Sequence, residues 1–277
     1  MPSPRRWMLR RPGMLIPVFF LSSSVAAGQF PAREATVVSL GGSFTNASGF
    51  SSAAGNQAGL GWIDGPSLSL HQSLPLLTGG LTFSSICIQS ATTSGGIGAH
   101  LSTLGIPGLN QSSLWVSSGV MLFPGVSAGA GLNVRLTSTG DRFFHRPGIG
   151  CALGIQVRIG EDLMIGGHIR HPAAWTPETS GPAVDHMMIS SGVSCIFFRN
   201  HTYYTEFHLM PGTGLQICQG IRSIIGDRVG ISFGFHNHPC SFTGGLDWDP
   251  GNWTIQFAYE FMPDNGPTPH ITLAREW

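Results

Sequence analysis

Residues 253–261, Trp253-Thr254-Ile255-Gln256-Phe257-Ala258-Tyr259-Glu260-Phe261, decide the fold class. Every odd position carries a large apolar side chain, and every even position carries a small or polar one. This alternation has the period of two that a β-strand shows, whereas a helix would show a period of 3.6 residues. Similar alternation recurs in residues 126–137, 149–157, 203–209 and 229–235, so we predict an all-β protein.

The alternating segments number about fourteen, and most span about nine to thirteen residues, the length that a tilted strand needs to cross a bilayer. Their predicted ranges are 66–73, 79–90, 94–104, 113–122, 125–137, 148–158, 162–171, 186–198, 202–210, 214–224, 228–237, 240–248, 252–262 and 268–277. Alternate connections are tight, and those between them are often longer: 105–112, 138–147, 172–185 and 263–267. Tight turns at one end and longer loops at the other are typical of bacterial outer-membrane barrels.

The composition excludes several other classes of protein. Charged residues make up only 10% of the 277 residues, too few for an ordinary soluble surface. The hydrophobic share of 42% argues against a disordered chain, and the body of the chain has no apolar run long enough for a membrane-spanning helix. We therefore expect a transmembrane antiparallel β-barrel.

A secreted β-sandwich is the alternative fold, because its strands would alternate as well. A sandwich packs its apolar face inward and needs charge on its outer face, whereas the polar positions here are mainly Gly, Ser, Thr and Gln. Small polar residues suit a narrow lumen, and closure of the sheet removes the edges that would leave unpaired backbone groups in lipid. These considerations favour the barrel.

The chain is predicted to have three parts: a signal peptide at 1–27, an N-terminal segment at 28–65 and the barrel at 66–277. The first part has an arginine-rich start, a short apolar core and small residues before position 28. Its removal takes four of the 14 basic residues and none of the 14 acidic ones, which leaves a formal net charge of −4. We expect export to the outer membrane, and no nucleic-acid partner.

Motifs that would indicate an enzyme, a metal site or a cofactor are missing from the sequence. It contains no nucleophile elbow, phosphate-binding loop, HExxH or EF-hand pattern, and its five cysteines have no zinc-site spacing. His236-Asn237-His238 is interpreted as part of a plain loop. We therefore predict no catalytic residue, no metal, no cofactor and no enzymatic activity.

If the large apolar side chains face lipid, the opposite phase of each strand lines the lumen. The candidate lumen residues are Arg135, Arg158, His168, Arg170, Glu206, His208, Arg222 and Glu260, with His100 and Gln156 in the same phase. These side chains would either contact a ligand or form an internal ion-pair network that holds the barrel's shape. For the network, Arg paired with Glu across neighbouring strands is expected.

The segment before the barrel resembles the N-terminal part of the FadL-like outer-membrane barrels. Leu40-Gly41-Gly42-Ser43-Phe44 and Asn56-Gln57-Ala58-Gly59-Leu60 stand where that group has a Leu-Gly-Gly-Ala-Phe stretch and an Asn-Pro-Ala-Gly-Leu motif, and Leu68-Ser69-Leu70 then starts a strand. Gln57 departs from the group's proline, and the group's acidic run is missing from 45–55. The motifs cover about 30 residues; the strand pattern and the terminal Trp277 extend the likeness loosely over the chain.

The resemblance implies a hatch, which is an N-terminal segment folded inside the barrel; an ordinary periplasmic lead-in is the alternative. Its expected residues are Gly41, Gly42, Phe44, Asn56, Ala58 and Gly59. The group includes long-chain fatty-acid transporters and the PorV/PorQ proteins of type IX secretion. We accordingly expect a secretion or surface-attachment component.

In that hypothesis, the longer loops would bind secretion-system or secreted proteins through Phe143, Phe144 and Trp175. A channel for hydrophobic small molecules, such as long-chain fatty acids, is the alternative function, and a purely structural barrel is a third. Outer-membrane lipid is a partner in every case.

Overall fold

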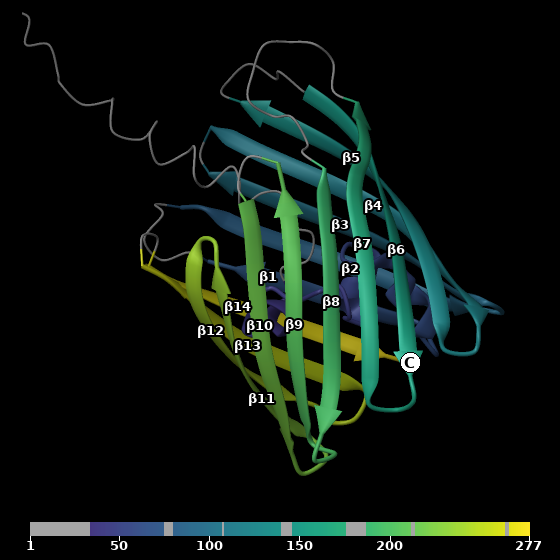
Figure 1. The fold of residues 1–277 in the computed structure, drawn as a ribbon. Helices are drawn as coiled ribbons and strands as arrows, with labels where there is room; N and C mark the ends of the chain where they lie inside the picture. The colour runs from purple at the N-terminus through teal and green to yellow at the C-terminus, as the bar shows by residue number, and fades with distance from the viewer. Residues whose placement is uncertain are drawn as a thin grey trace, which may run out of the picture. The chain divides into compact units, whose positions relative to one another are not determined.

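Fourteen antiparallel strands close into a barrel in which each strand pairs with its neighbours in the chain and the first pairs with the last (Figure 1). The computed structural model describes residues 34–74, 80–106, 108–139, 146–175, 187–211, 214–263 and 266–277. The strands are β1 (Ser67–Ser73), β2 (Thr82–Thr92), β3 (Gly95–Ile106), β4 (Leu109–Phe123), β5 (Val126–Thr139), β6 (Arg146–Ile159), β7 (Leu163–Trp175), β8 (Met188–Phe197), β9 (His201–Met210), β10 (Gly214–Ile225), β11 (Val229–Asn237), β12 (Cys240–Trp248), β13 (Trp253–Met262) and β14 (Gly266–Glu276). The predicted fold class is therefore confirmed.

The two faces of the wall follow the alternation in the sequence. Phe233, Leu153 and Phe257 point outward and are 63%, 54% and 50% exposed. Ser232 and Gln156, from the opposite phase, are fully buried inside. A surface of large apolar side chains around a polar interior reverses the arrangement of a soluble protein, as a lipid environment requires.

The two ends of the barrel differ. The connections 93–94, 124–125, 160–162, 198–200, 226–228 and 249–252 join consecutive strands at one end, called here the tight-turn end. The remaining connections lie at the opposite end, called the loop end. Residue 66 and the end of β14 also lie at the tight-turn end, because the strand number is even.

The structure extends strands into two regions that the sequence analysis assigned to loops, residues 105–112 and Trp175. Most of 105–112, predicted as a loop, belongs to β3 and β4, where Asn110 pairs with Gly105 in an unbroken ladder. Polar residues hide this extension in the sequence, because backbone pairing continues where the apolar alternation has stopped. Trp175, placed in a partner loop, is instead the last residue of β7 and pairs with Ile149. Phe143 and Phe144 lie outside the described residues, as does the predicted signal peptide.

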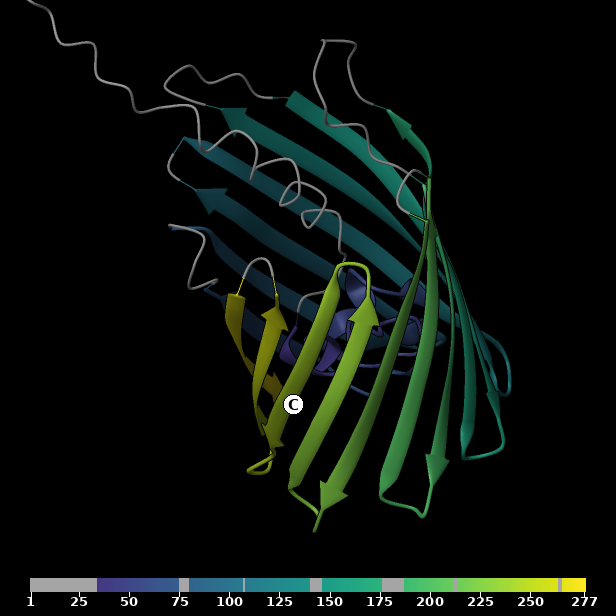
Figure 2. The same cartoon turned by 60° about the vertical axis from the view of Figure 1, so that its left-hand side comes forward.

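The N-terminal segment lies inside the barrel, where Figure 2 shows it enclosed by the strands. It contains α2 (Ala35–Ser39) and the 3₁₀ helices η1 (Phe50–Ala53) and η2 (Gln57–Trp62). Residues 34–66 are called the hatch from here on. The hatch and the barrel belong to one compact unit, Pro31–Trp277. None of the helices in the described part of the chain is long and apolar enough to cross a membrane.

Candidate functional site: the hatch and its contacts with the lumen wall

Glycines on the inner face of the wall let the hatch backbone come close to it. A Cβ atom on Gly129 would overlap the backbone of Gln57, and one on Gly220 would lie 2.8 Å from the Cα atom of Leu40. Other inward glycines whose Cβ atoms would meet the hatch are Gly96, Gly98, Gly119, Gly131, Gly154, Gly166, Gly192, Gly234 and Gly245. This set, with Gly129 and Gly220, is called the glycine belt. It explains the glycine-rich inner phase of the sequence, which we had interpreted only as a narrow lumen.

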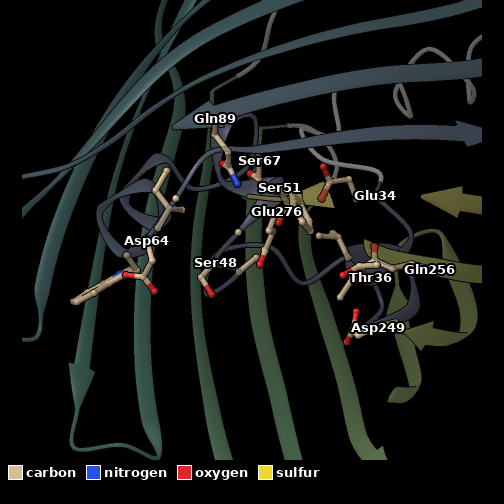
Figure 3. A pocket seen from close by; sticks show the side chains of 18 of the residues that line it. Glu34, Thr36, Ser48, Ser51, Asp64, Ser67, Gln89, Asp249, Gln256 and Glu276 are labelled. Carbon is tan, nitrogen blue, oxygen red and sulfur yellow. The ribbon is translucent and has the colours of Figure 1, made fainter. Parts of the chain in front are cut away.

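Between the hatch and the tight-turn end, a cavity of about 630 Å³ remains (Figure 3). Its walls are the hatch and the inner faces of β1, β2, β9, β10, β13 and β14. Glu34 is a buried carboxyl group in this wall, and its Oε1 accepts a hydrogen bond of 3.0 Å from the Ser69 hydroxyl. Burial raises the pKa of Glu34 to about 7, although the Ser69 hydrogen bond opposes this shift.

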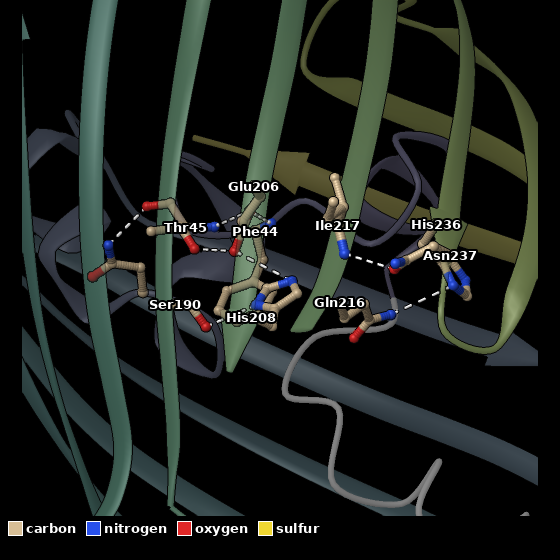
Figure 4. Close-up of polar contacts among 10 residues, drawn as sticks. Phe44, Thr45, Ser190, Glu206, His208, Gln216, Ile217, His236 and Asn237 are labelled. Atoms are coloured by element: carbon tan, nitrogen blue, oxygen red, sulfur yellow. Dashed lines mark hydrogen bonds and ion pairs between the residues drawn. The ribbon is translucent and has the colours of Figure 1, made fainter. Parts of the chain in front are cut away.

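Glu206, on β9, binds the centre of the hatch (Figure 4). Its Oε2 accepts backbone N–H bonds from Phe44 at 2.7 Å and Thr45 at 2.9 Å, and its Oε1 accepts the Thr45 hydroxyl. Glu206 is 2% exposed. A buried carboxylate needs such donors to offset the loss of water, so the hatch supplies what the wall residue requires.

The Phe44 ring lies between two histidines of the wall. It stacks on His208 with a centroid distance of 5.2 Å and meets His168 edge-on at 5.6 Å. His208 is held in turn by Ser190, whose hydroxyl lies 2.8 Å from Nδ1. Three predicted residues, Phe44, His168 and His208, are therefore brought together at one point.

Asn56 and Gln156 hold the next part of the hatch through their side-chain amides. Asn56 Nδ2 donates to the Thr45 carbonyl at 2.7 Å and to the wall carbonyl of Ile155 at 3.3 Å, while its Oδ1 accepts from the Ala58 N–H. Gln156 Nε2 donates to the same Thr45 carbonyl at 2.9 Å. Asn56 thus caps the start of η2 by accepting the backbone N–H of Ala58, and both are predicted hatch residues.

Gly41, Gly42 and Gly59 also lie in the hatch. Gly41 and Gly42 have φ angles of 71° and 87°, a left-handed conformation that favours glycine, and they follow the end of α2. A Cβ on Gly59 would overlap the Ser52 hydroxyl. These glycines allow the sharp turns of the hatch.

Two predicted lumen arginines pack on tryptophan rings. Arg170 lies 4.5 Å from the centroid of Trp115 and donates to the Ala54 carbonyl of the hatch. Arg158 lies 4.1 Å from the centroid of the hatch residue Trp62 and remains exposed near the tight-turn end. Both therefore support the hatch through cation–π contact or hydrogen bonding.

The polar pairs differ from the expected Arg–Glu pairing. Arg222 Nε lies 2.9 Å from Asp247 Oδ2, and Glu260 Oε1 lies 3.1 Å from His236 Nε2. Arg135 is buried, with 9% exposure. Asp247 occupies an inward position in the alternation of β12, so the sequence pattern could have identified it as a lumen residue. His236 was wrongly assigned to a loop, since it lies in β11 and points inward.

A few large apolar side chains point into the barrel, although most inward side chains are small or polar. Phe83, Met188 and Met210 lie near the loop ends of β2, β8 and β9, and Trp115 lies deeper on β4. Met188 belongs to a buried cluster with Phe44, and Met210 packs against that cluster. This group, called the apolar lumen group, packs buried apolar and aromatic side chains on the loop-end side of the hatch.

The geometry defines a class of protein: a transmembrane β-barrel whose lumen holds its own N-terminal segment. No protein-family model matches the chain, and no curated protein matches it. Among the described residues, no three His, Cys, Asp or Glu side chains are arranged to hold a metal ion.

Solved structures with the same fold do match. The toluene transporter TodX of P. putida has a TM-score of 0.71 at 10% identity, with 90% of this chain and 99% of that chain covered. The toluene transporter TbuX of Ralstonia pickettii has a TM-score of 0.66 at 13% identity, with the same coverage. The CymD monoaromatic hydrocarbon channel has a TM-score of 0.67 at 12% identity and covers 88% of this chain and 97% of that one. At these identities, the likeness establishes the shared fold.

Proposed function

We propose that the protein is an outer-membrane channel for small hydrophobic molecules. The observation that carries the proposal is the match of nearly the whole chain to barrels described as toluene transporters or as a monoaromatic hydrocarbon channel. It favours the channel over the secretion component, which was our first hypothesis from the sequence. The predicted signal peptide at 1–27 supports export to the outer membrane, with the tight-turn end facing the periplasm.

The apolar lumen group supports the same proposal from the chain's own residues. Phe83, Met188 and Met210 lie near the loop end, and Met188 packs on Phe44, so a shift of the hatch would expose these side chains to a hydrophobic molecule that enters from the loop end. Apolar contact area and sulfur–aromatic contacts would bind such a molecule without demanding a fixed shape. The inward polar residues below would then hold the hatch, while the apolar group receives the ligand.

Passage requires the hatch to shift, because its contacts fill the lumen at the level of Phe44. These contacts are hydrogen bonds and ring contacts, each contributing about 0.5–1.5 kcal/mol to stability. Contacts of this strength can break one at a time while the strands of the barrel stay paired. The hatch is therefore proposed to act as the gate.

The test measures initial uptake of radiolabelled toluene and, separately, of radiolabelled palmitate by Gram-negative cells that express the protein. Uptake of at least one probe should exceed that of cells with an empty vector. Met188→Arg should reduce it, since a charge replaces an apolar contact, whereas the matched control Met188→Leu should retain it.

Each variant is first checked for barrel formation by heat-modifiable migration on a denaturing gel. A folded protein that raises uptake of neither probe would refute the proposal. Recovery of large secretion subunits in a pull-down from the same membranes, without uptake, would instead favour the secretion hypothesis.

A further inference from the structure

The cavity on the tight-turn side of the hatch has an excess of negative charge. Carboxylates line it from four places in the chain: Glu34, Asp64, Asp249 and Glu276 (Figure 3). Among the described residues, the arginine that lines it is Arg222, which is already paired with Asp247.

Asp64 has a second charged neighbour, because Arg158 lies close enough to interact with it electrostatically. Burial raises the pKa of Glu34 to about 7, so its charge is only partial at neutral pH. Asp249 and Glu276 still leave the cavity negative. It should attract cations and repel anions.

The same cavity contains buried hydrogen-bond acceptors without a partner. Gln89 Oε1, Gln256 Oε1 and Ser67 Oγ have no hydrogen-bond partner among the described residues. The three residues are 3%, 7% and 5% exposed, and all three line the cavity. Buried polar atoms normally have a hydrogen-bond partner, so these three atoms are available to the N–H groups of a ligand in the cavity.

We propose that this cavity binds a linear aliphatic polyamine. Its volume of about 630 Å³ falls in the range of about 300–1,000 Å³ that small-molecule sites occupy. The carboxylates are spread around the cavity, and no described group of three could hold a single metal ion. An elongated cation with several ammonium groups can reach separated carboxylates, and its N–H donors match the buried acceptors.

This site is distinct from the channel function. The apolar lumen group lies on the loop-end side of the hatch, whereas the polyamine site lies on the tight-turn side. A polyamine would bridge Asp64 of the hatch to Gln256 on β13 and to Asp249 in the turn after β12. Its binding should therefore stabilise the closed position of the hatch.

The test uses the full mature protein in a neutral detergent and measures binding of radiolabelled spermidine by equilibrium dialysis at fixed ionic strength. Spermidine should bind saturably, and a diol of similar length should not compete. The variant Asp64→Asn/Asp249→Asn/Glu276→Gln should weaken binding by about tenfold or more, because it removes three of the carboxylates that line the cavity.

The matched control is Glu161→Gln/Asp162→Asn/Asp227→Asn, which removes three exposed acids from the tight turns outside the cavity. It should leave spermidine affinity unchanged. Gln89→Leu, which alters no charge, should weaken binding by roughly threefold to tenfold through loss of a buried acceptor.

Three results would overturn the proposal: no saturable binding, equal loss of affinity in the two triple variants, or unchanged affinity in Gln89→Leu. The last result would mean diffuse attraction to negative charge. Heat-modifiable migration of every variant shows that the barrel has formed. Hydrocarbon uptake is measured in parallel, so that failure of the channel proposal is seen separately.

Discussion

At the scale of single residues, Glu206 connects the wall and the hatch more directly than its sequence position suggests. The carboxylate accepts two successive backbone N–H groups and one hydroxyl, all from Phe44 and Thr45. The alternation in residues 203–209 predicted that its side chain would point inward. The partner could not be predicted, because 161 residues of sequence separate Glu206 from Thr45.

Glu206→Gln should loosen the centre of the hatch without opening the barrel. The amide keeps one acceptor oxygen where the carboxyl group has two, so a buried donor of Phe44 or Thr45 is left unsatisfied, which costs about 1–3 kcal/mol. We expect amide hydrogen exchange at Phe44 and Thr45 to become about ten- to a hundredfold faster. Glu161→Gln, on an exposed turn, serves as the control, and equal exchange in both variants would contradict the role assigned to Glu206.

At the scale of elements, the strands were easier to predict than the hatch. Period-two alternation is local, so residues 253–261 identified β13 to within a few residues. The predicted loop at 105–112 was wrong, because a ladder can extend through Asn110 and Gln111 without apolar residues. The docking of the hatch depends on glycines from strands throughout the chain, which no local pattern connects.

Gly129→Ala should displace the hatch, because the new Cβ would overlap the Gln57 backbone. Overpacking of this kind costs about 1–3 kcal/mol. Limited proteolysis should cleave residues 34–66 faster, while heat-modifiable migration remains. The control is Gly244→Ala, where the new Cβ meets nothing closer than 3.7 Å. Similar cleavage rates in the two variants would refute the close-contact role of the belt.

At the scale of the whole molecule, large apolar side chains cover the outer face of the barrel and polar side chains line its interior. That inversion was predictable, because the low charge content and the small polar phase both argued against a soluble sandwich. The position of the apolar lumen group was not predicted. Phe83 and Met188 occupy inward positions, so an apolar residue in the chain does not by itself identify the lipid-facing side.

Phe257→Arg should destabilise the barrel in lipid by about 2–4 kcal/mol if Phe257 lies near the bilayer midplane. Urea unfolding of the protein in phospholipid vesicles measures this change, with Phe257→Leu as the apolar control. A loss no larger than that of the control would contradict the outward, lipid-facing orientation seen for Phe257.

The position of the hatch immediately before β1 also constrains biogenesis. Residue 66 leads directly into β1, and β1 completes the ring by pairing with β14, the strand of the barrel farthest from it in the chain. The N-terminal segment therefore has two routes into the lumen: before this seam forms, or through the tight-turn end, where residue 66 and the cavity lie. Insertion of this protein into a bilayer therefore involves two events, the pairing of β1 with β14 and the docking of residues 34–66 inside the barrel.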